Sequence, residues 1–510
     1  MTRICINSLR PRTTDIFGKR ALLAPHVLKS HIEAFDPAIS VILHDFPADA
    51  PIENVVSANA MSKPNIIAFS TYVWNIDTME TASRELKKYL TTPIVFGGPG
   101  SGYQGAEILS DNGSVDVVVA GEGESALLRL CYAFSKRNSR SLSDIPNIYF
   151  REEGRIVETR HGHVEPLEEY SYHLDVTGWE GCARVCYETS RGCVMQCKFC
   201  LWHKEGGNRI RCYPMEKVKG DLDRLMNIES MRMVEFVDAD LFMKPKRALA
   251  ILEHFATLNN CREQRGLPRA YILLETNPEL MNDEVIGELA NHDRILDFGL
   301  QTIDETVSTK LGRPFQRSRY FGKVEKVVTL KSRRFSEHMV EVIYGLPGET
   351  LEGFRRTVAY VLDLDYLVYI WGFRLLMMPG TAVRVEAVEA GAVFNQSAPY
   401  ELISSDSWTQ DNLRRAEQLS RALFIIEYAV PEVFDSVKRL SPGKRLPAVD
   451  ALTDFLLHPS TNNDWFSSRP AEEVHLFQRC CTVRDDPHFV ELRMSLSKSC
   501  QSALAQAGFG

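Results

Sequence analysis

Three cysteines stand close together in the middle of this chain, at Cys193, Cys197 and Cys200. They follow directly on Val185–Thr189, a short segment with the composition of a buried strand. Thiolates are soft ligands that favour iron–sulfur clusters or zinc. Three thiolates from one tight loop can hold three irons of a [4Fe-4S] cluster, which leaves the fourth iron open to a small molecule.

Other uses of these cysteines stay open. Cys212 is the nearest residue that could complete the ligand set, and His203 could be the fourth ligand of a zinc site. The cysteines could also be unligated thiols. No disulfide staples are needed, because 510 residues with 44% hydrophobic side chains suffice for several cores. In a cytosolic chain the 12 cysteines are expected to be reduced, so clustered ones point to metal binding or catalysis.

The charge pattern excludes several classes of partner. Lys and Arg number 59 against 67 Asp and Glu, for a net charge of −8, and no long basic block occurs. We therefore expect no nucleic acid partner. The sequence has no apolar run of membrane-spanning length, so we expect no membrane partner. The first residues lack the layout of a signal peptide, which favours a cytoplasmic protein.

Residues 1–150 alternate between strand and helix signals. Near-continuous apolar strands separated by helices predict a parallel sheet covered on both faces, which is a doubly wound, Rossmann-like α/β domain. A hairpin is expected from Ile148–Phe150 and Arg155–Val157, and residues 151–183 are expected to be a linker. The expected strands of the first domain are Arg3–Leu9, Ile39–His44, Asn65–Ser70, Pro93–Phe96 and Asp116–Ala120.

A second series of strands and helices occupies residues 184–385. Six units predict a partial (β/α)6 barrel, since a full barrel has eight. Residues 386–510 are expected to be mainly helical, with an amphipathic helix over Gln410–Tyr428. The expected barrel strands are Val185–Thr189, Met233–Val237, Tyr271–Glu275, Leu296–Gln301, Met339–Tyr344 and Tyr369–Leu376.

The cysteine motif, with the aromatic Phe199 before its last cysteine, resembles the signature of radical S-adenosylmethionine (SAM) enzymes. Downstream segments at strand ends extend the resemblance. Gly97–Pro99 and Asp116–Glu124 resemble the N-terminal cobalamin-binding domain found in one class of that superfamily. The downstream segments are Glu275–Pro278, Gly299–Thr302, Ile343–Thr350 and Met378–Thr381.

This resemblance implies two cofactors, a [4Fe-4S] cluster on Cys193, Cys197 and Cys200, and SAM. Reductive cleavage of SAM would give a 5′-deoxyadenosyl radical that abstracts hydrogen from a substrate. The electron would come from a flavodoxin- or ferredoxin-type donor. The residues that would contact SAM are Phe199, Glu275, Gln301, Gly345, Pro347 and Gly348; the alternatives are core packing, a polar rim and ordinary turns.

Several other side chains fall near predicted strand ends, where barrel sites assemble. They are candidates for substrate contacts or proton transfer, and a structural role is the alternative for each. These candidates are Glu188, Asp238, Asp240, Tyr344, Trp371 and Arg374.

Binding of cobalamin by the first domain stays open. Some cobalamin domains supply an axial histidine from an Asp-x-His-x-x-Gly pattern, which this chain lacks, and Gly100 stands where relatives often carry a histidine. A domain that has lost cobalamin is the alternative. The stretch Gly97–Gly102 predicts a close approach of the backbone to a ligand at the sheet edge.

The layout is also similar to radical SAM diol dehydratases that deoxygenate aminoglycosides in antibiotic biosynthesis, as in the apramycin pathway. Our first expectation is therefore radical dehydration of a small, sugar-like substrate, with a separate reductase completing the product. Glu188, Asp238, Asp240 and Glu275 would form an acidic pocket for a polycation. One alternative is cobalamin-dependent C-methylation, and another is a non-enzymatic metal- or cobalamin-binding regulator.

Overall fold

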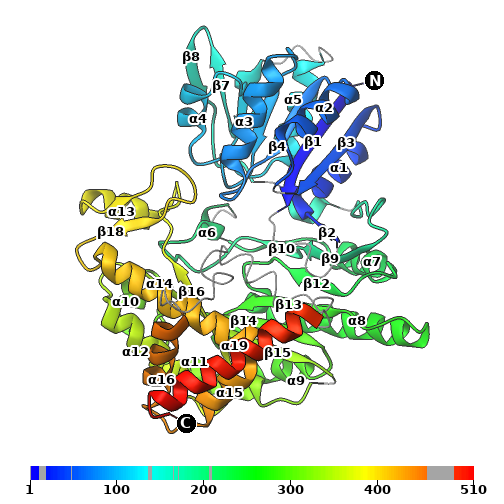
Figure 1. The fold of residues 1–510 in the computed structure, drawn as a ribbon. Coiled ribbons are helices and arrows are strands. Elements are labelled where there is room, and N and C mark those ends of the chain that lie inside the picture. The colour runs from blue at the N-terminus through cyan, green and yellow to red at the C-terminus, as the bar shows by residue number, and fades with distance from the viewer. Residues whose placement is uncertain are drawn as a thin grey trace.

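Two seven-stranded sheets dominate the fold, one above the other in Figure 1. The first, in blue and cyan, comes from the N-terminal part of the chain, and the second, mainly green, from the middle. The computed structural model of this protein describes residues 2–10, 19–47, 49–135, 141–164, 166–170, 172–205, 209–332, 334–456 and 487–509.

The first sheet has the order β3–β1–β4–β5–β6–β7–β8, and its neighbours from β3 to β6 run parallel. The antiparallel hairpin β7–β8 extends one edge. β4 is buried along its whole length, which explains its unbroken apolar sequence. The strands span Thr2–Arg10 (β1), Ile39–Pro47 (β3), Ile66–Ser70 (β4), Ile94–Gly97 (β5), Val117–Val119 (β6), Ile148–Glu152 (β7) and Arg155–Glu158 (β8).

Helices cover both faces of the first sheet, which confirms the doubly wound prediction. Side chains of α1 and α5 share a buried cluster with one face, and those of α2, α3 and α4 share one with the other. The strand order reverses direction between β1 and β4, and doubly wound sheets bind ligands at the carboxyl ends of the strands beside such a point. The helices span Leu23–Phe35 (α1), Ile52–Ser62 (α2), Ile76–Lys87 (α3), Gly105–Asp111 (α4) and Glu124–Phe134 (α5).

The second sheet has the order β16–β15–β14–β13–β12–β9–β2, and all neighbours run parallel. Its six strands from β9 to β16 confirm the predicted partial barrel. They span Cys182–Tyr187 (β9), Met233–Phe236 (β12), Tyr271–Thr276 (β13), Arg294–Gln301 (β14), Ser336–Tyr344 (β15) and Tyr369–Arg374 (β16). The intervening helices span Met215–Met226 (α7), Pro245–Gln264 (α8), Asp283–Leu289 (α9), Glu305–Lys310 (α10), Arg317–Val328 (α11) and Leu351–Leu362 (α12).

The seventh strand of this sheet comes from the N-terminal part of the chain. Lys19–Ala21 (β2) pairs with β9 before the chain returns to the first domain through α1. Sequence analysis did not predict this strand, because three residues are too short to show a pattern.

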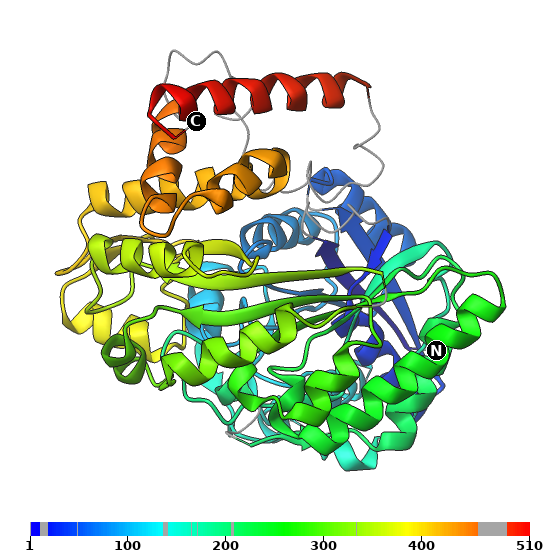
Figure 2. The same ribbon diagram turned by 90° about the horizontal axis from the view of Figure 1, so that it is seen from below.

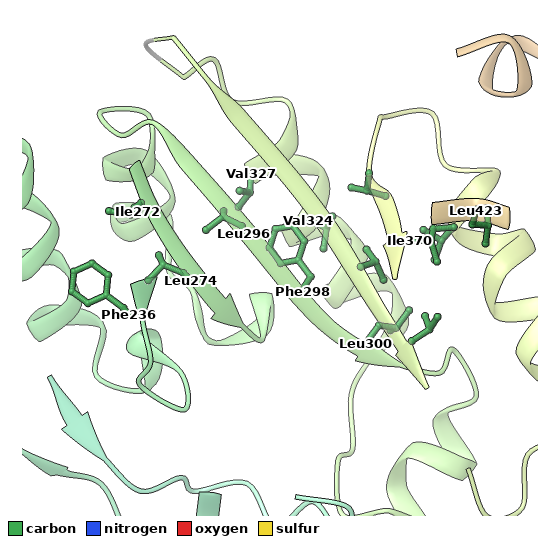
Figure 3. Close-up of a cluster of buried hydrophobic side chains, with 14 of the residues drawn as sticks. Phe236, Ile272, Leu274, Leu296, Phe298, Leu300, Val324, Val327, Ile370 and Leu423 are labelled. Atoms are coloured by element: carbon green, nitrogen blue, oxygen red, sulfur yellow. The ribbon is translucent and has the colours of Figure 1, made fainter. Parts of the chain in front are cut away.

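Side chains alternate between the two faces of the second sheet. Figure 3 shows side chains of the outer face packed in the core with those of α11 and of Gln410–Phe424 (α14). The strand residues are Phe236, Ile272, Leu274, Leu296, Phe298, Leu300 and Ile370, and the helix residues are Val324, Val327 and Leu423. A smaller inner cluster consists of Met233, Leu273, Ile295 and Met339. Glu275 follows Leu273 by two residues and therefore faces the inside of the barrel. By the same spacing from Met339, Glu341 does so too.

The C-terminal region is mainly helical, as predicted, and lies in orange and red at one edge of the second sheet in Figure 2. A π-helical turn, Ile425–Ala429, follows α14, and its Glu427 accepts a hydrogen bond from the amide of Ile370 in β16 (2.8 Å). The edge strand is thus covered. The elements span Ala382–Glu389 (α13), Val393–Phe394 (β17), Leu402–Ser404 (β18), Gln410–Phe424 (α14), Pro431–Arg439 (α15), Arg445–Leu456 (α16) and Pro487–Gln506 (α19). No helix in the described ranges is long and apolar enough to cross a bilayer.

Replacing Phe298 by alanine should lower the free energy of unfolding by about 3–5 kcal/mol, because its fully buried ring fills the core between sheet and helices. Urea unfolding followed by circular dichroism measures this. Met61→Ala is the control, since that side chain is 77% exposed and its loss should change stability by less than about 0.5 kcal/mol. Equal effects of the two changes would contradict the assigned core.

Candidate functional site

The cysteine loop, residues 192–200, is held at its base by a short hairpin. Ser190–Arg191 (β10) pairs with Arg211–Cys212 (β11) directly before the loop. Asp238, at the end of β12, accepts hydrogen bonds from the amide and hydroxyl of Thr189 (3.0 and 2.7 Å) and from the hydroxyl of Ser190 (2.5 Å). The chain that leads into the cysteines is therefore fixed to the barrel.

The three cysteines are free thiols, with Cys193 and Cys197 buried and Cys200 half-buried. Burial raises the pKa of Cys193, and it raises that of Cys200 to about 11. In the described part of the chain, no three His, Cys, Asp or Glu side chains converge on a single metal ion. Zinc needs such convergence, whereas each thiolate of an iron–sulfur cluster binds a different iron. The donor set therefore fits the cluster better than zinc.

Among the described residues, the other cysteines do not join this set. Cys182 and Cys186 are buried thiols of β9, and the Cys186 thiol donates to Glu235 (3.4 Å). Cys212 lies in β11, and Cys500 is buried in the C-terminal core. Residues 480 and 481, which are also cysteines, lie outside the described residues.

Arg313 lies beside the cysteine loop and was not singled out by sequence analysis. Its guanidinium donates to Cys197 Sγ (3.7 Å) and to the carbonyl of Gly299 (2.6 Å). The preceding Gly312 has φ of +74°, and a Cβ there would stand 2.3 Å from the carbonyl oxygen of Gln196. The cysteine loop therefore rests on this segment, and a fixed positive charge stabilises negative charge at the cysteines.

Gln301 adopts a strained backbone conformation at the carboxyl end of β14. Its φ is +71°, which is uncommon for a residue other than glycine, and the strand register shifts between Gly299 and Gln301. The side chain is buried and has no hydrogen-bond partner among the described residues. Its amide nitrogen would stand 3.1 Å from a Cβ on Gly299, so glycine there leaves room for it.

Two carboxylates face the inside of the barrel without a hydrogen-bond partner in the described chain. Part of the Glu275 side chain is exposed to solvent. Even so, desolvation by the surrounding barrel and then repulsion from Glu235 raise the pKa of its carboxyl group. Burial and then repulsion from Glu275 raise the pKa of Glu341 to about 8, against the lowering effect of Arg313. Sequence analysis missed Glu341, because nothing in its continuous strand shows which face it occupies.

Asp240 joins the segment after β12 to the end of β13. It accepts hydrogen bonds from the amides of Phe242 (2.8 Å) and Asn277 (2.6 Å) and from the Thr276 hydroxyl (3.2 Å). Burial raises its pKa to about 7, and its charge also acts on Cys193. Asp240 and Asp238 thus both hold loops together.

Other predicted residues lie away from the barrel interior or are engaged elsewhere. Tyr344 is buried in the core with its ring edge-on to Phe354 (5.6 Å between centroids), and burial raises its pKa. Glu188 accepts from Arg191 and from the hydroxyl of Tyr213 (2.7 Å). The arrangement therefore does not place Tyr344 or Glu188 with the partner-free carboxylates.

The predicted SAM-contact segments take mixed positions. Phe199 packs partly against the barrel core. Gly345 has φ of +94°, and a Cβ there would meet Leu402 at 3.1 Å, so it faces the C-terminal region. Gly348 is open around its Cα, and Pro347 is half-buried.

The two remaining candidates of β16 have protein partners. The Trp371 indole donates to the hydroxyl of Tyr428 (3.0 Å). Arg374 pairs with Glu401 (3.2 Å) and Glu417 (3.7 Å).

The carboxyl ends of the first sheet carry an exposed aromatic pair. Tyr72 and Trp74, after β4, are stacked with centroids 4.3 Å apart, and Trp74 is 47% exposed. The backbone approach predicted for Gly97–Gly102 is to the neighbouring loop. A Cβ on Gly98 would stand 2.6 Å from the Thr71 carbonyl oxygen.

Loops from both sheets meet between the domains, as Figure 1 shows. Gln104, after β5, donates to the hydroxyl of Tyr400 (2.8 Å). A Cβ on Gly380, after β16, would stand 2.4 Å from the ring of Tyr103. The carboxyl edge of the first sheet therefore faces the barrel.

Comparison with protein families divides the chain in the same way. Residues 27–130 match the B12 binding domain family, and residues 187–361 match the Radical SAM superfamily. The second match includes the three cysteines, Glu275, Gln301 and Arg313. The resemblance of the sequence to radical SAM enzymes with an N-terminal cobalamin-binding domain is confirmed.

Three relatives illustrate the likeness. A 2-(S-pantetheinyl)-carbapenam-3-carboxylate methyltransferase of Streptantibioticus cattleyicolor is 24% identical over 70% of this chain and 53% of its own length. The cobalamin-dependent radical SAM methyltransferase TokK of Streptomyces tokunonensis is 23% identical over 62% of this chain and 47% of its own. The chain thus spans about half the length of these curated relatives.

The third is the solved structure of OxsB, a cobalamin-dependent SAM radical enzyme with aqua-cobalamin and SAM bound. It shares the fold, with a TM-score of 0.67 and 14% identity, over 99% of this chain and 80% of that one.

Replacing Cys193, Cys197 or Cys200 by alanine should abolish both the bound cluster and the formation of 5′-deoxyadenosine, because each thiolate would hold a separate iron. Iron analysis of protein reconstituted without oxygen and chromatography of the SAM products test this. Cys261→Ala, at an exposed position, should keep both properties. Full iron and full activity in any of the three loop variants would refute the ligand assignment.

Proposed function

Because this chain carries a radical SAM domain behind a B12-binding domain, we propose that it is a cobalamin-dependent radical SAM methyltransferase that acts on a small molecule. The names of the carbapenam methyltransferase and of TokK support methyl transfer.

The observation that carries the proposal is the contact between the two carboxyl edges. Gln104, beyond β5, reaches Tyr400 of the C-terminal region, and Glu124, at the start of α5, reaches Arg191 beside the cysteine loop. A cofactor at the β1/β4 reversal would therefore face the cysteines. Such an arrangement suits transfer between two cofactors.

The residues at the first sheet edge fit a corrin. Trp74, stacked on Tyr72, offers a flat apolar surface beside the β1/β4 reversal. The segments 9–22, 71–75, 98–104 and 120–123 contain no histidine. Cobalamin would therefore bind here without an axial histidine from these loops.

The barrel residues fit the other two groups. The cluster would be held by Cys193, Cys197 and Cys200. SAM would be held by Glu275 and Gln301, and the positive charge of Arg313 would attract its carboxylate. When bound, the cluster and SAM would supply a 5′-deoxyadenosyl radical, and cobalamin would supply a methyl group. The electron for SAM cleavage would come from a flavodoxin- or ferredoxin-type donor.

Dehydration of an aminoglycoside, our first expectation, has less support. Most of the carboxylates expected to form its acidic pocket are engaged in hydrogen bonds within the protein. Glu188, Asp238 and Asp240 are each hydrogen-bonded to neighbouring loops, and Glu275 alone of the four has no such partner in the described chain.

Protein reconstituted with iron, sulfide and hydroxocobalamin should hold about four irons and about one cobalt per chain. After reduction with SAM it should form both S-adenosylhomocysteine and 5′-deoxyadenosine. Trp74→Ala should lower cobalt without lowering iron, and Tyr89→Ala, at an exposed site of the same domain, should change neither. Iron without cobalt in the unaltered protein would overturn methyl transfer in favour of chemistry that needs no cobalamin.

SAM should bind more tightly as pH rises through about 8, because Glu341 then ionises and attracts the sulfonium. The dissociation constant should fall up to about tenfold between about pH 7 and 9. Glu341→Gln should remove this component, and comparison with the variant corrects for titration of the SAM amino group. Glu352→Gln, on the exposed side of α12, is the control. Identical pH profiles for unaltered protein and Glu341→Gln would rule out this role.

A further inference from the structure

Five charged side chains form a buried cluster between the two domains, here called the interdomain ion cluster. Two arginines come from the hairpin that carries the cysteine loop, and two glutamates come from the first domain. The members are Arg191, Arg211, Glu122, Glu124 and Glu188.

Arg191 is the centre of this cluster. Its Nη2 lies 2.5 Å from Glu124 Oε1 and 2.6 Å from Glu188 Oε1, and its Nη1 lies 3.5 Å from Glu122 Oε1. The guanidinium also stands over the ring of Tyr213, 5.7 Å from the centroid. One side chain thus joins β9, the cysteine hairpin and the first domain.

Arg211 adds a second link from the partner strand of the hairpin. It pairs with both carboxylate oxygens of Glu122, one of them through Nη1 at 3.3 Å. Both strands at the base of the cysteine loop therefore bind the Glu122–Glu124 segment. Sequence analysis assigned that segment to the first domain alone.

Because the members of the cluster are buried, their ion pairs require accurate geometry. The side chains of Glu124 and Arg211 are each only 4% exposed, and that of Arg191 is 15% exposed. Because buried ions are costly unless well paired, the cluster tolerates little displacement of one domain against the other.

Because its centre is an arginine, the cluster fixes the relative orientation of the two domains as well as their contact. A planar guanidinium donates along fixed directions to several acceptors, whereas an apolar contact can slide. Arg191 stands two residues before Cys193. A change in its position would therefore move the cysteine loop relative to the edge of the first sheet.

We propose that Arg191 is a positioning residue that sets the spacing between the cofactor edge of the first domain and the cysteine loop. The proposal rests on the proposed function for its catalytic meaning. S-adenosylhomocysteine reports methyl transfer to cobalamin in one domain, and 5′-deoxyadenosine reports reductive cleavage at the other. Loss of spacing should therefore change the ratio of these two products.

The test compares Arg191→Lys and Arg191→Gln in the full chain, reconstituted with iron, sulfide and hydroxocobalamin. Both variants should keep their iron, and the ratio of S-adenosylhomocysteine to 5′-deoxyadenosine should fall about 10- to 100-fold, because small misplacements of reacting groups have effects of that size. Lysine should be the milder change, since it keeps the positive charge but loses the planar guanidinium that donates to several acceptors at once.

Arg355→Gln is the matched control. Arg355 in α12 makes a two-point pair with Asp450 in α16 (2.8 and 2.7 Å), and this pair is remote from the hairpin in sequence and fold. The product ratio should not change. An unchanged ratio in both Arg191 variants would overturn the proposal.

Calorimetry of the cofactor-free chain gives a second readout that does not depend on methyl transfer. Arg191→Gln should separate the unfolding of the first domain from that of the barrel, whereas Arg355→Gln should not. If the unaltered protein forms no S-adenosylhomocysteine, the proposed function fails and calorimetry alone decides the positioning role. A single, unshifted transition in Arg191→Gln would then overturn it.

Discussion

The parallel direction of the strands is the constraint on which the rest of this structure depends. In each sheet the parallel strands send their carboxyl ends to one edge, and the two edges face each other. The loops beyond β4, β5 and β6 therefore meet loops beyond β9 and β16. Every group proposed for the chemistry lies at one of these two edges or inside the barrel between them.

Burial at this interface turns several carboxylates into structural groups. Asp238 and Asp240 stand at strand ends where catalytic residues of barrels are found, yet their oxygens accept hydrogen bonds from neighbouring loops. They hold the cysteine loop and β13 in place. Glu275 and Glu341 differ because the described chain offers them no hydrogen-bond partner, and this leaves them available to a cationic ligand. The position of a residue at a strand end thus identifies the edge that holds the site. Its hydrogen bonds then distinguish carboxylates that hold loops in place from those that are available to a ligand.

The sequence was sufficient to predict the two sheets, because long apolar strands and intervening helices carry strong periodic signals. It was not sufficient to assign faces within the barrel. In the apolar strand β15, Tyr344 and Glu341 are three residues apart, so one enters the core and the other faces inside. Arg313 and Arg191 were missed for another reason. Their partners, Cys197 and Glu124, lie 116 and 67 residues away, and spacing along the chain does not show such contacts.

The interdomain ion cluster is important for the relative position of the two domains because they share few apolar contacts. Each domain has its own apolar core. Among the described residues before position 150, those that pack in the core of the barrel are Ala21, Leu23, Val27 and Val73. A larger shared core would fix the domains by burial alone. Here the hydrogen bonds of Arg191 and Gln104 hold the domains together instead. Because hydrogen bonds are directional, they also fix the angle between the two domains, which apolar burial would not. These contacts therefore hold the carboxyl edges of the two sheets in register with each other.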